Sequence, residues 1–154
     1  MRVAVAYDHR GRKAVECVKT VIRRKGHEYV DLGPKESGAV DCPDYAYVAA
    51  TSVAQKEADT AILLCNTGMG MSMSANKVKG VRAVRCCDDF DARAARSQFD
   101  ANVLCLSGEL LAQKTLGDIV EAWLSDGFEE RVRSRRLIEK IRAIENGRDP
   151  RTAE

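Results

Sequence analysis

A cysteine stands at the end of a continuous apolar run in the middle of this chain. The run covers residues 60–64, reads Thr-Ala-Ile-Leu-Leu, and leads directly into Cys65. Uninterrupted runs of this kind are typical of strands that are buried on both faces of a sheet. Ligands bind just outside the carboxyl ends of strands in an open α/β sheet. The thiol of Cys65 is therefore predicted to act as a nucleophile or a base.

The segment after Cys65 predicts a loop that binds an anion. Thr67 and Gly68 follow the thiol closely, and Gly70 stands two positions further on. The backbone amides from Gly68 to Ser72 would point toward a ligand at the start of the next helix, where a negative charge is readily held. A thiol beside such a loop favours an enzyme over a scaffold protein.

Asp8 and His9 directly follow another strand-like segment, residues 2–7, and are expected at the same edge of the sheet. From the residues alone, two interpretations are open. Asp8 could cap the following helix while His9 lies on the surface. Alternatively, both could face the crevice that contains Cys65, which would make them part of a catalytic site.

Strand-like and helix-like segments alternate along the chain. The pattern predicts strands at 2–7, 28–32, 60–65, 81–85 and 102–106, and helices at 13–25, 45–53, 88–96, 116–124 and 130–144. Such alternation indicates a parallel sheet with helices on both faces. We expect one domain over residues 1–147, including the C-terminal helix, followed by a polar tail over residues 148–154.

Composition narrows the class of protein. The chain has 154 residues, of which 45% are hydrophobic and 31% charged, and its net charge is +2. These values are ordinary for one globular domain and give no case for a nucleic-acid or membrane partner. The sequence lacks an apolar run of about 18 residues, the length that a membrane-spanning helix needs. Because it begins with a strand-like segment and not with a signal peptide, we expect a cytoplasmic protein.

The six cysteines do not form a recognisable metal or disulfide motif. No two of them are spaced as C-x-x-C, and His9 and His27 lie far from any cysteine pair. This spacing predicts neither a zinc site nor a disulfide framework. Apart from Cys65, four of them are expected to be small buried hydrophobic side chains. These four are Cys17, Cys86, Cys87 and Cys105.

Two other functions of α/β domains fit the residues poorly. Gly68-x-Gly70 begins a dinucleotide-binding pattern, but Met73 occupies the third glycine position and the motif follows the third strand instead of the first. A signalling receiver domain would need an acidic phosphoacceptor after the third strand and a lysine after the fifth. This chain has Cys65 and Ser107 there.

Motifs spread along the chain carry a family resemblance. They are Asp8-His9-x-Gly11, Lys25-Gly26-His27-Glu28, Asp41-x-Pro43-Asp44-Tyr45-Ala46, the segment from Cys65 to Ser72, Ala75-Asn76-Lys77-x-x-Gly80-Val81-Arg82-Ala83, and Asp100-Ala101-Asn102-Val103-Leu104. With these motifs the chain resembles the ribose-5-phosphate isomerase B family, which also includes galactose-6-phosphate and allose-6-phosphate isomerases. The resemblance runs from Val3 to about Ile141.

The resemblance implies an architecture and an activity. The fold would be a Rossmann-like three-layer α/β/α sandwich with a five-stranded parallel sheet. The chain would form a homodimer or homotetramer with active sites at the subunit interface. It would interconvert aldose and ketose phosphates, such as ribose 5-phosphate and ribulose 5-phosphate, without a metal or another cofactor.

The resemblance also implies roles for individual residues. Cys65 would move a proton between C1 and C2 of the sugar, and Asp8 and Thr67 would handle the hydroxyl protons. The amides from Gly68 to Ser72 would stabilise an enediolate. His9 would face the phosphate or the sugar ring. The implied substrate-binding set is His9, Tyr45, Asn66, Gly68, Gly70, Met71, Ser72, Gln98, Phe99, Arg133 and Arg136.

The chain departs from the family pattern at two positions that concern the substrate. Gln98-Phe99 stands where the family has His-Asn, so the histidine implied to open the sugar ring is replaced by glutamine. Glu109 stands where the family has an arginine for the phosphate, so Arg10 or Arg12, with Arg133 or Arg136, would take over that contact. The alternatives left open are a tetrose 4-phosphate or hexose 6-phosphate isomerase, or a non-catalytic sugar-phosphate-binding subunit.

Overall fold

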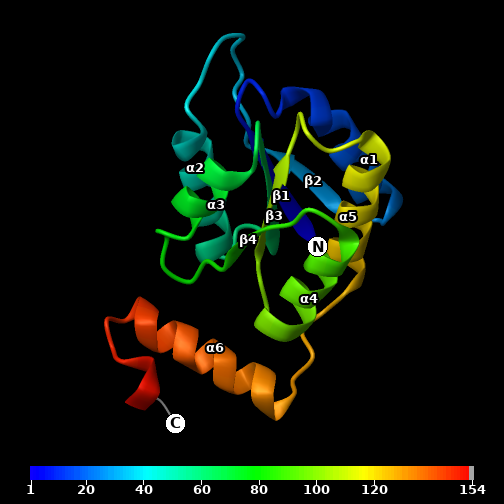
Figure 1. Cartoon of the computed structure of the whole chain (residues 1–154). Coiled ribbons are helices and arrows are strands. Elements are labelled where there is room, and N and C mark those ends of the chain that lie inside the picture. The colour runs from blue at the N-terminus through cyan, green and yellow to red at the C-terminus, as the bar shows by residue number, and fades with distance from the viewer. Residues whose placement is uncertain (153–154) are drawn as a thin grey trace.

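The computed structural model describes residues 1–152 and contains a central sheet of five parallel strands (Figure 1). The strands are β1 (Arg2–Tyr7), β2 (Glu28–Asp31), β3 (Thr60–Cys65), β4 (Ala83–Arg85) and β5 (Val103–Ser107), in the order β2-β1-β3-β5-β4. Every residue of β3 is buried, because β1 and β5 flank it and helices cover both faces. The predicted α/β fold with a five-stranded parallel sheet is confirmed.

Helices form a layer on each side of the sheet. In Figure 1, α2 (Cys42–Ala54) and α3 (Met69–Ala75) lie to the left of the sheet, and α1 (Val15–Arg24) and α5 (Gln113–Ser125) to its right. Helix α4 (Asp89–Phe99) packs against α5. Each layer has its own hydrophobic core: Trp123, Ile22 and Leu104 belong to the α1/α5 side, and Ala49, Leu63 and Met71 to the α2/α3 side.

Strand register brings the carboxyl ends of the three central strands level with one another. Tyr7 pairs with Leu64, and Cys65 pairs with Ser107. The residues that follow these strands therefore meet at one edge of the sheet, as is expected for a parallel sheet.

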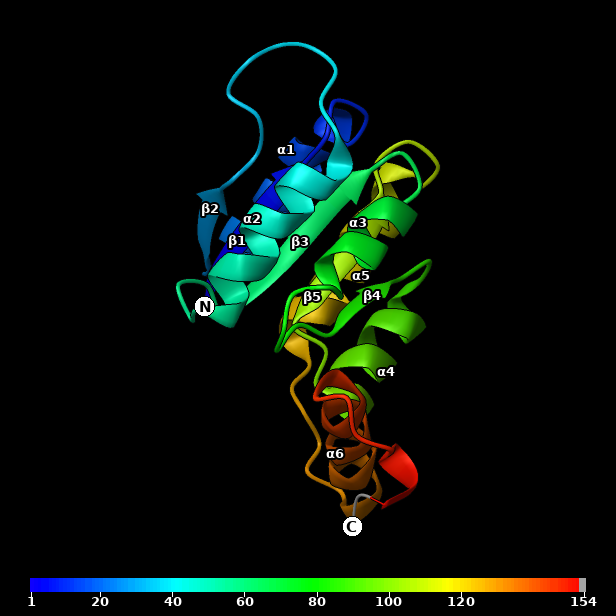
Figure 2. The ribbon, with the colours of Figure 1, turned by 90° about the vertical axis from the view of Figure 1, so that its left-hand side faces the viewer.

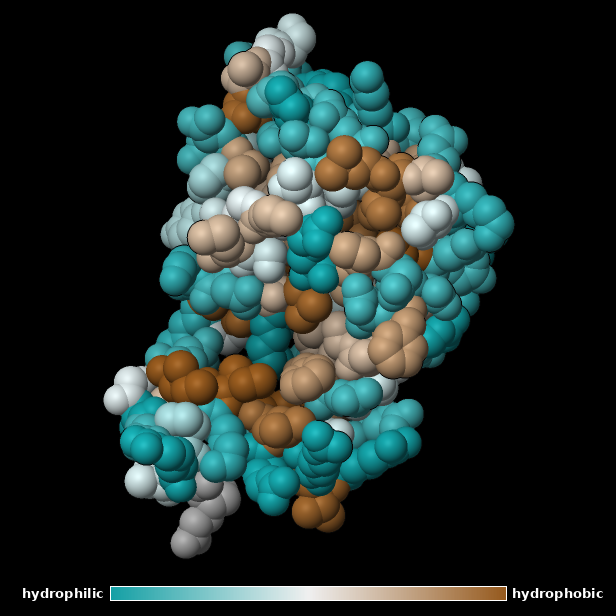
Figure 3. Space-filling model, viewed as in Figure 1, coloured by the Kyte–Doolittle hydropathy of each residue, from teal (hydrophilic) through white to brown (hydrophobic). Residues whose placement is uncertain are grey.

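The last helix, α6 (Val132–Glu145), lies apart from the two layers and contacts α4 and the short 3₁₀ helix η2 (Pro150–Thr152) (Figures 1 and 2). Ile138 is buried, but Ile141 is 38% and Ile144 is 61% exposed. These two isoleucines line a cleft of about 360 Å³ with Val78 and Val81. Figure 3 shows hydrophobic side chains along the side of α6 that faces the body of the molecule, with a hollow between them.

Residues 148–152, in the predicted polar tail, turn back along α6. The Lys140 ammonium donates a hydrogen bond of 2.6 Å to the carbonyl of Pro150, and Arg148 N donates to Ala143 O at 2.8 Å. The last two positions of the tail lie outside the described residues. Among residues 1–152, every helix is too short or too polar to cross a lipid bilayer.

The structure corrects several details of the sequence-based prediction. Strand β4 begins at Ala83 and not at Val81, because the Arg82 amide donates to Asn102 Oδ1 at 2.7 Å instead of entering the sheet. The first helix opens with a separate 3₁₀ turn, η1 (Arg12–Ala14). Cys87 was expected to be buried, but it is exposed because it leaves the sheet after β4 and precedes the first turn of α4. Cys17 is only half-buried.

Candidate active site

Cys65 ends β3 in a buried position, with 4% of its surface exposed. Its Sγ accepts a hydrogen bond of 3.1 Å from the backbone N–H of Gly68. Gly68 has φ +79°, a left-handed conformation that favours glycine, and a Cβ there would lie 3.1 Å from the carbonyl carbon of Leu106. The loop therefore turns tightly around the thiol and points the Gly68 N–H at its sulfur.

The amides predicted to form the anion-binding loop are not all free. Gly68 N is bonded to Cys65 Sγ, Met69 N donates to Thr67 Oγ1 at 3.3 Å, and Ser72 N donates to Gly68 O at 3.1 Å. Within residues 1–152, the amides of Gly70 and Met71 have no hydrogen-bond acceptor. Both belong to the first turn of α3, where unpaired N–H groups and the helix dipole favour a negative charge.

Side chains from two neighbouring strand ends hold the carbonyl groups of this loop. Arg85, at the end of β4, donates from Nε to Thr67 O at 2.6 Å. Ser107, at the end of β5, donates from Oγ to Asn66 O. Both roles were missed in the sequence analysis, although each residue ends a predicted strand or follows one directly.

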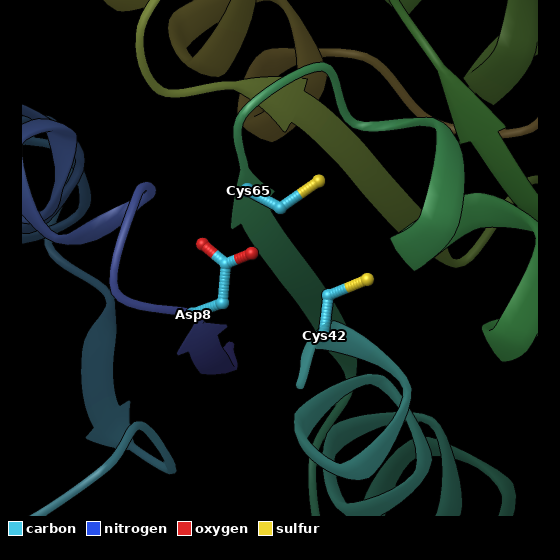
Figure 4. A group of neighbouring side chains, drawn as sticks. All are labelled: Asp8, Cys42 and Cys65. Carbon is cyan, nitrogen blue, oxygen red and sulfur yellow. The ribbon is translucent and has the colours of Figure 1, made fainter. Parts of the chain in front are cut away.

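Asp8 shares features with both of the interpretations that the sequence left open, although it caps a loop turn and not the following helix, and its catalytic role stays a prediction. Its Oδ1 accepts hydrogen bonds from Arg10 N at 2.8 Å and Gly11 N at 2.9 Å, so it caps the turn after β1. The side chain is nevertheless 6% exposed and lies beside Cys65 (Figure 4). Gly11 makes this packing possible, because a Cβ there would lie 2.2 Å from the carbonyl oxygen of Leu64.

Cys42 places a second thiol at this edge, and the sequence analysis missed it. It is the first residue of α2, and its Sγ lies within 4.8 Å of both Cys65 Sγ and a carboxylate oxygen of Asp8 (Figure 4). Burial raises the pKa of the Cys42 thiol, and the neighbouring Cys65 and Asp8 raise it further. The only sequence signal was its place in the Asp41-Cys42-Pro43 helix start.

His9 and Tyr45 border the site. His9 is exposed, and its Nδ1 lies 3.3 Å from Val40 N and 3.2 Å from Val40 O in the loop that leads to α2. Tyr45 is half-buried in the first turns of α2 and packs against the small-residue core of that layer. His9 therefore lies at the carboxyl edge, as predicted, and Tyr45 lies near the start of the helix that begins there with Cys42; their contacts with a substrate stay predictions.

A charged pair, Arg10 and Glu109, surrounds the side chain of Asn66, the residue that follows Cys65. Arg10 Nη1 lies 3.5 Å from Glu109 Oε2. With its NH₂ group turned toward Glu109, the Asn66 amide donates to Oε2 at 3.0 Å and accepts from Arg10 Nη1 at 3.0 Å. The Glu109 carboxylate is therefore engaged by both the Arg10 guanidinium and the Asn66 amide.

Four of the predicted substrate-binding residues lie elsewhere in this single chain. Gln98 and Phe99 are exposed at the end of α4, where the Phe99 carbonyl accepts from Arg82 Nε at the amino-terminal edge of the sheet. Arg133 and Arg136 are exposed on α6. One chain does not bring these side chains to Cys65, because α4 runs back from the carboxyl edge to the opposite edge.

The fold and the site together define a class of protein. A parallel α/β sheet carries, at its carboxyl edge, a buried thiol, a buried carboxylate and a helix start with two free amides. These are the parts of a Rossmann-like enzyme that moves protons on a small anionic substrate.

Comparisons with known proteins identify the family. The model of the Ribose/Galactose Isomerase family matches residues 3–141. Ribose-5-phosphate isomerase B of Escherichia coli (strain K12) is 35% identical over 148 residues, which are 96% of this chain and 99% of that protein. The chain therefore belongs to the ribose/galactose isomerase family.

Solved structures agree with this assignment. The type B ribose 5-phosphate isomerase of Trypanosoma brucei has a TM-score of 0.90 and 39% identity, covering 93% of this chain and 97% of that chain. The enzyme of Trypanosoma cruzi has a TM-score of 0.92 and 38% identity, covering 95% and 97%. The Rossmann-like sandwich is thus shared across the full domain.

Proposed function

We propose that this isomerase interconverts ribose 5-phosphate and ribulose 5-phosphate, with Cys65 as the base that moves the proton between C2 and C1. The observation that carries this proposal is the surroundings of the Cys65 thiol. The thiol is buried, accepts the Gly68 N–H and lies within 4.8 Å of the Asp8 carboxylate. The Gly68 amide orients the sulfur, and the thiolate form of a cysteine can take a proton from carbon.

The reaction can be written with the groups that the site provides. The Cys65 thiolate takes the proton from C2 of the aldose, the C1 carbonyl oxygen gains negative charge, and a C1–C2 double bond forms. The free amides of Gly70 and Met71 would stabilise that oxygen. Asp8 and Thr67 would move the hydroxyl proton from O2 to O1, and Cys65 would return its proton to C1, which gives the ketose.

The rest of the site is proposed to come from a second copy of the chain. Gln98, Phe99, Arg133 and Arg136 are exposed and lie away from the Cys65 of their own chain. Ile141 and Ile144 are partly exposed on α6, as expected for a helix that packs against a partner. In such a dimer, Arg133 and Arg136 of one subunit would bind the phosphate at the Cys65 of the other, since arginine matches phosphate geometry.

Complementation between two inactive variants tests this shared site. Cys65→Ala and the double variant Arg133→Ala/Arg136→Ala should each be nearly inactive as pure proteins. When the two are unfolded together and refolded as an equal mixture, half of the dimers are mixed and each of these has one intact site. Activity should then recover to about one quarter of wild type.

Sedimentation velocity at micromolar concentration should show a dimer or tetramer. Recovery of no activity, or a fully active monomer, would exclude a site shared between subunits.

Gln98 favours a second candidate substrate. Glutamine cannot act as an acid or a base, so it cannot open a sugar ring in the way that a histidine could. A four-carbon sugar phosphate such as erythrose 4-phosphate needs no such step, because its phosphorylated O4 cannot close a furanose ring. His9, which lies at the same edge as Cys65, is the ring-opening candidate if the substrate is the pentose.

The ratio of kcat/KM values decides between the two sugars. For ribose 5-phosphate we expect a value at least tenfold above that for erythrose 4-phosphate, a difference of about 1.4 kcal/mol in transition-state binding. His9→Gln should then lower turnover of the pentose more than that of the tetrose. A preference for erythrose 4-phosphate would reassign the substrate to the tetrose and leave the isomerase chemistry unchanged.

A further inference from the structure

Three side chains of types that bind metals lie close together although they come from separate segments of the chain. They are Asp8, Cys42 and Cys65. Asp8 follows β1, Cys42 begins α2 and Cys65 ends β3 (Figure 4). The carboxylate oxygen and the two sulfur atoms all lie within 4.8 Å of one another. Asp8 and Cys65 are buried, and Cys42 is half-buried.

We propose that this cluster binds a thiophilic divalent cation, Zn²⁺, and that the bound ion reversibly inhibits the isomerase. The inhibition rests on the proposed role of Cys65, because a thiolate that coordinates a metal is not available to take a proton from the sugar. Binding of the ion does not depend on that role. The sequence analysis predicted no zinc site, because it considered only cysteines and histidines close together in the chain.

The donor set selects the type of ion. Two cysteines and one carboxylate match the ligands of zinc, whereas Mg²⁺ and Ca²⁺ prefer oxygen alone. Three protein ligands leave the fourth position open to water or to a substrate oxygen. At zinc–ligand lengths of about 2.0–2.3 Å, tetrahedral coordination needs donor atoms less than about 4 Å apart, so the present cluster has to contract by only about 1 Å.

The surroundings of the ligands already resemble the outer shell of a metal site. Two backbone amides, those of Arg10 and Gly11, hold Oδ1 of Asp8, which fixes the carboxylate and leaves Oδ2 for the ion. The Gly68 amide orients Sγ of Cys65. Such outer hydrogen bonds position the ligands of known metal sites. Gly70 closes the cluster near Cys42, because a Cβ at that position would lie 2.6 Å from the Cys42 sulfur.

Cys42 is a ligand of the proposed metal site but has no role in the proposed isomerase reaction, so it allows the two to be tested separately. The proposed proton transfers use Cys65, Asp8 and Thr67, and none of them passes through Cys42. Replacing Cys42 should therefore weaken metal binding without stopping the reaction. Cys87 offers a matched control, since it is an exposed thiol after β4 that does not belong to the cluster.

The experiment compares wild type, Cys42→Ser, Cys42→Ala and Cys87→Ser, all kept reduced so that no disulfide can form. Zn²⁺ affinity is measured by calorimetry, and Co²⁺ serves as a spectroscopic substitute whose near-ultraviolet absorption reports thiolate ligands. We expect one Zn²⁺ per chain in wild type and Cys87→Ser, with thiolate absorption for Co²⁺. Both Cys42 variants should bind at least tenfold more weakly and show a reduced Co²⁺–thiolate band.

The isomerase assay provides the second measurement. Zn²⁺ should inhibit wild type, a chelator should restore its activity, and the Cys42 variants should need at least tenfold more Zn²⁺ for the same inhibition. Equal affinity in wild type and both Cys42 variants would overturn the proposed site, as would a Co²⁺ spectrum without thiolate absorption. Binding without inhibition would overturn the inhibitory role. If the metal-free protein were inactive but still bound Zn²⁺ through Cys42, the proposed isomerase reaction would be contradicted and the proposed metal site would not.

Discussion

Replacing Cys65 by alanine should lower kcat for ribose 5-phosphate by at least a factor of about 10²–10⁴, the contribution of a well-placed acid or base group. The expected loss is large because alanine carries no group that can take a proton from carbon, and the proposed role of Asp8 is to move the hydroxyl protons. The variant should still fold, since alanine fits the small buried position at the end of β3, but its melting temperature should fall slightly because the Gly68 amide loses its sulfur acceptor. Solvent deuterium should enter C1 or C2 of the sugar with wild type and not with the variant.

Two further variants sharpen this test of the base. Cys65→Ser retains the size and a hydroxyl acceptor for the Gly68 amide, but its pKa is too high for proton abstraction, so it should be as slow as Cys65→Ala. Cys87→Ala removes an exposed thiol after β4 and should retain full activity. Near-normal turnover by Cys65→Ala would exclude Cys65 as the base.

Replacing Asp8 by asparagine should lower kcat by a similar factor of about 10²–10⁴, because an amide cannot shuttle a proton between O2 and O1. The fold should be preserved, since the asparagine carbonyl oxygen can still accept the Arg10 and Gly11 amides. Chemical denaturation should therefore show a free energy of unfolding close to that of wild type.

Alanine at the same position separates the two roles of Asp8. Asp8→Ala should lose the activity and also about 1–3 kcal/mol of unfolding free energy, because the buried Gly11 amide and the part-buried Arg10 amide lose their charged acceptor. If Asp8→Asn retained wild-type turnover, Asp8 would be a structural cap only. If Asp8→Asn were as unstable as Asp8→Ala, its loss of activity would reflect misfolding.

The sequence was sufficient to predict the parts of the site that directly follow buried strands. Cys65 and Asp8 belong to this group. Because parallel strands end at a common edge, the residues at or just after these ends lie close together whatever path the loops take. The strand order and the pairing of Cys65 with Ser107 agree with that reasoning. The glycine loop was predicted in outline, but which of its amides are free depends on hydrogen bonds that no spacing reveals.

Residues that depend on the path of a loop could not be predicted in this way. Cys42 reaches Cys65 only because the long connection after β2 returns α2 to the carboxyl edge. The contact of Arg10 with Glu109 needs the turns after β1 and β5 to lie side by side. Packing within α2 is a further example of what hydropathy alone does not predict: Val48 is 46% exposed, while smaller alanines such as Ala49 and Ala50 fill the contact with the sheet.

The close backbone contacts at the carboxyl edge affect how the substrate specificity of such enzymes can evolve. A Cβ at Gly11 would lie 2.2 Å from the Leu64 carbonyl oxygen, and one at Gly108 would lie 2.8 Å from the Gly11 Cα. The main chain itself therefore fixes the end of the site where protons move. The neighbouring side chains of Arg10, Asn66 and Glu109 are held by side-chain contacts and not by such close backbone packing. Mutation of these side chains can therefore change which length of sugar is recognised while the reacting groups keep their geometry. The same proton-transfer reaction can then act on a new substrate.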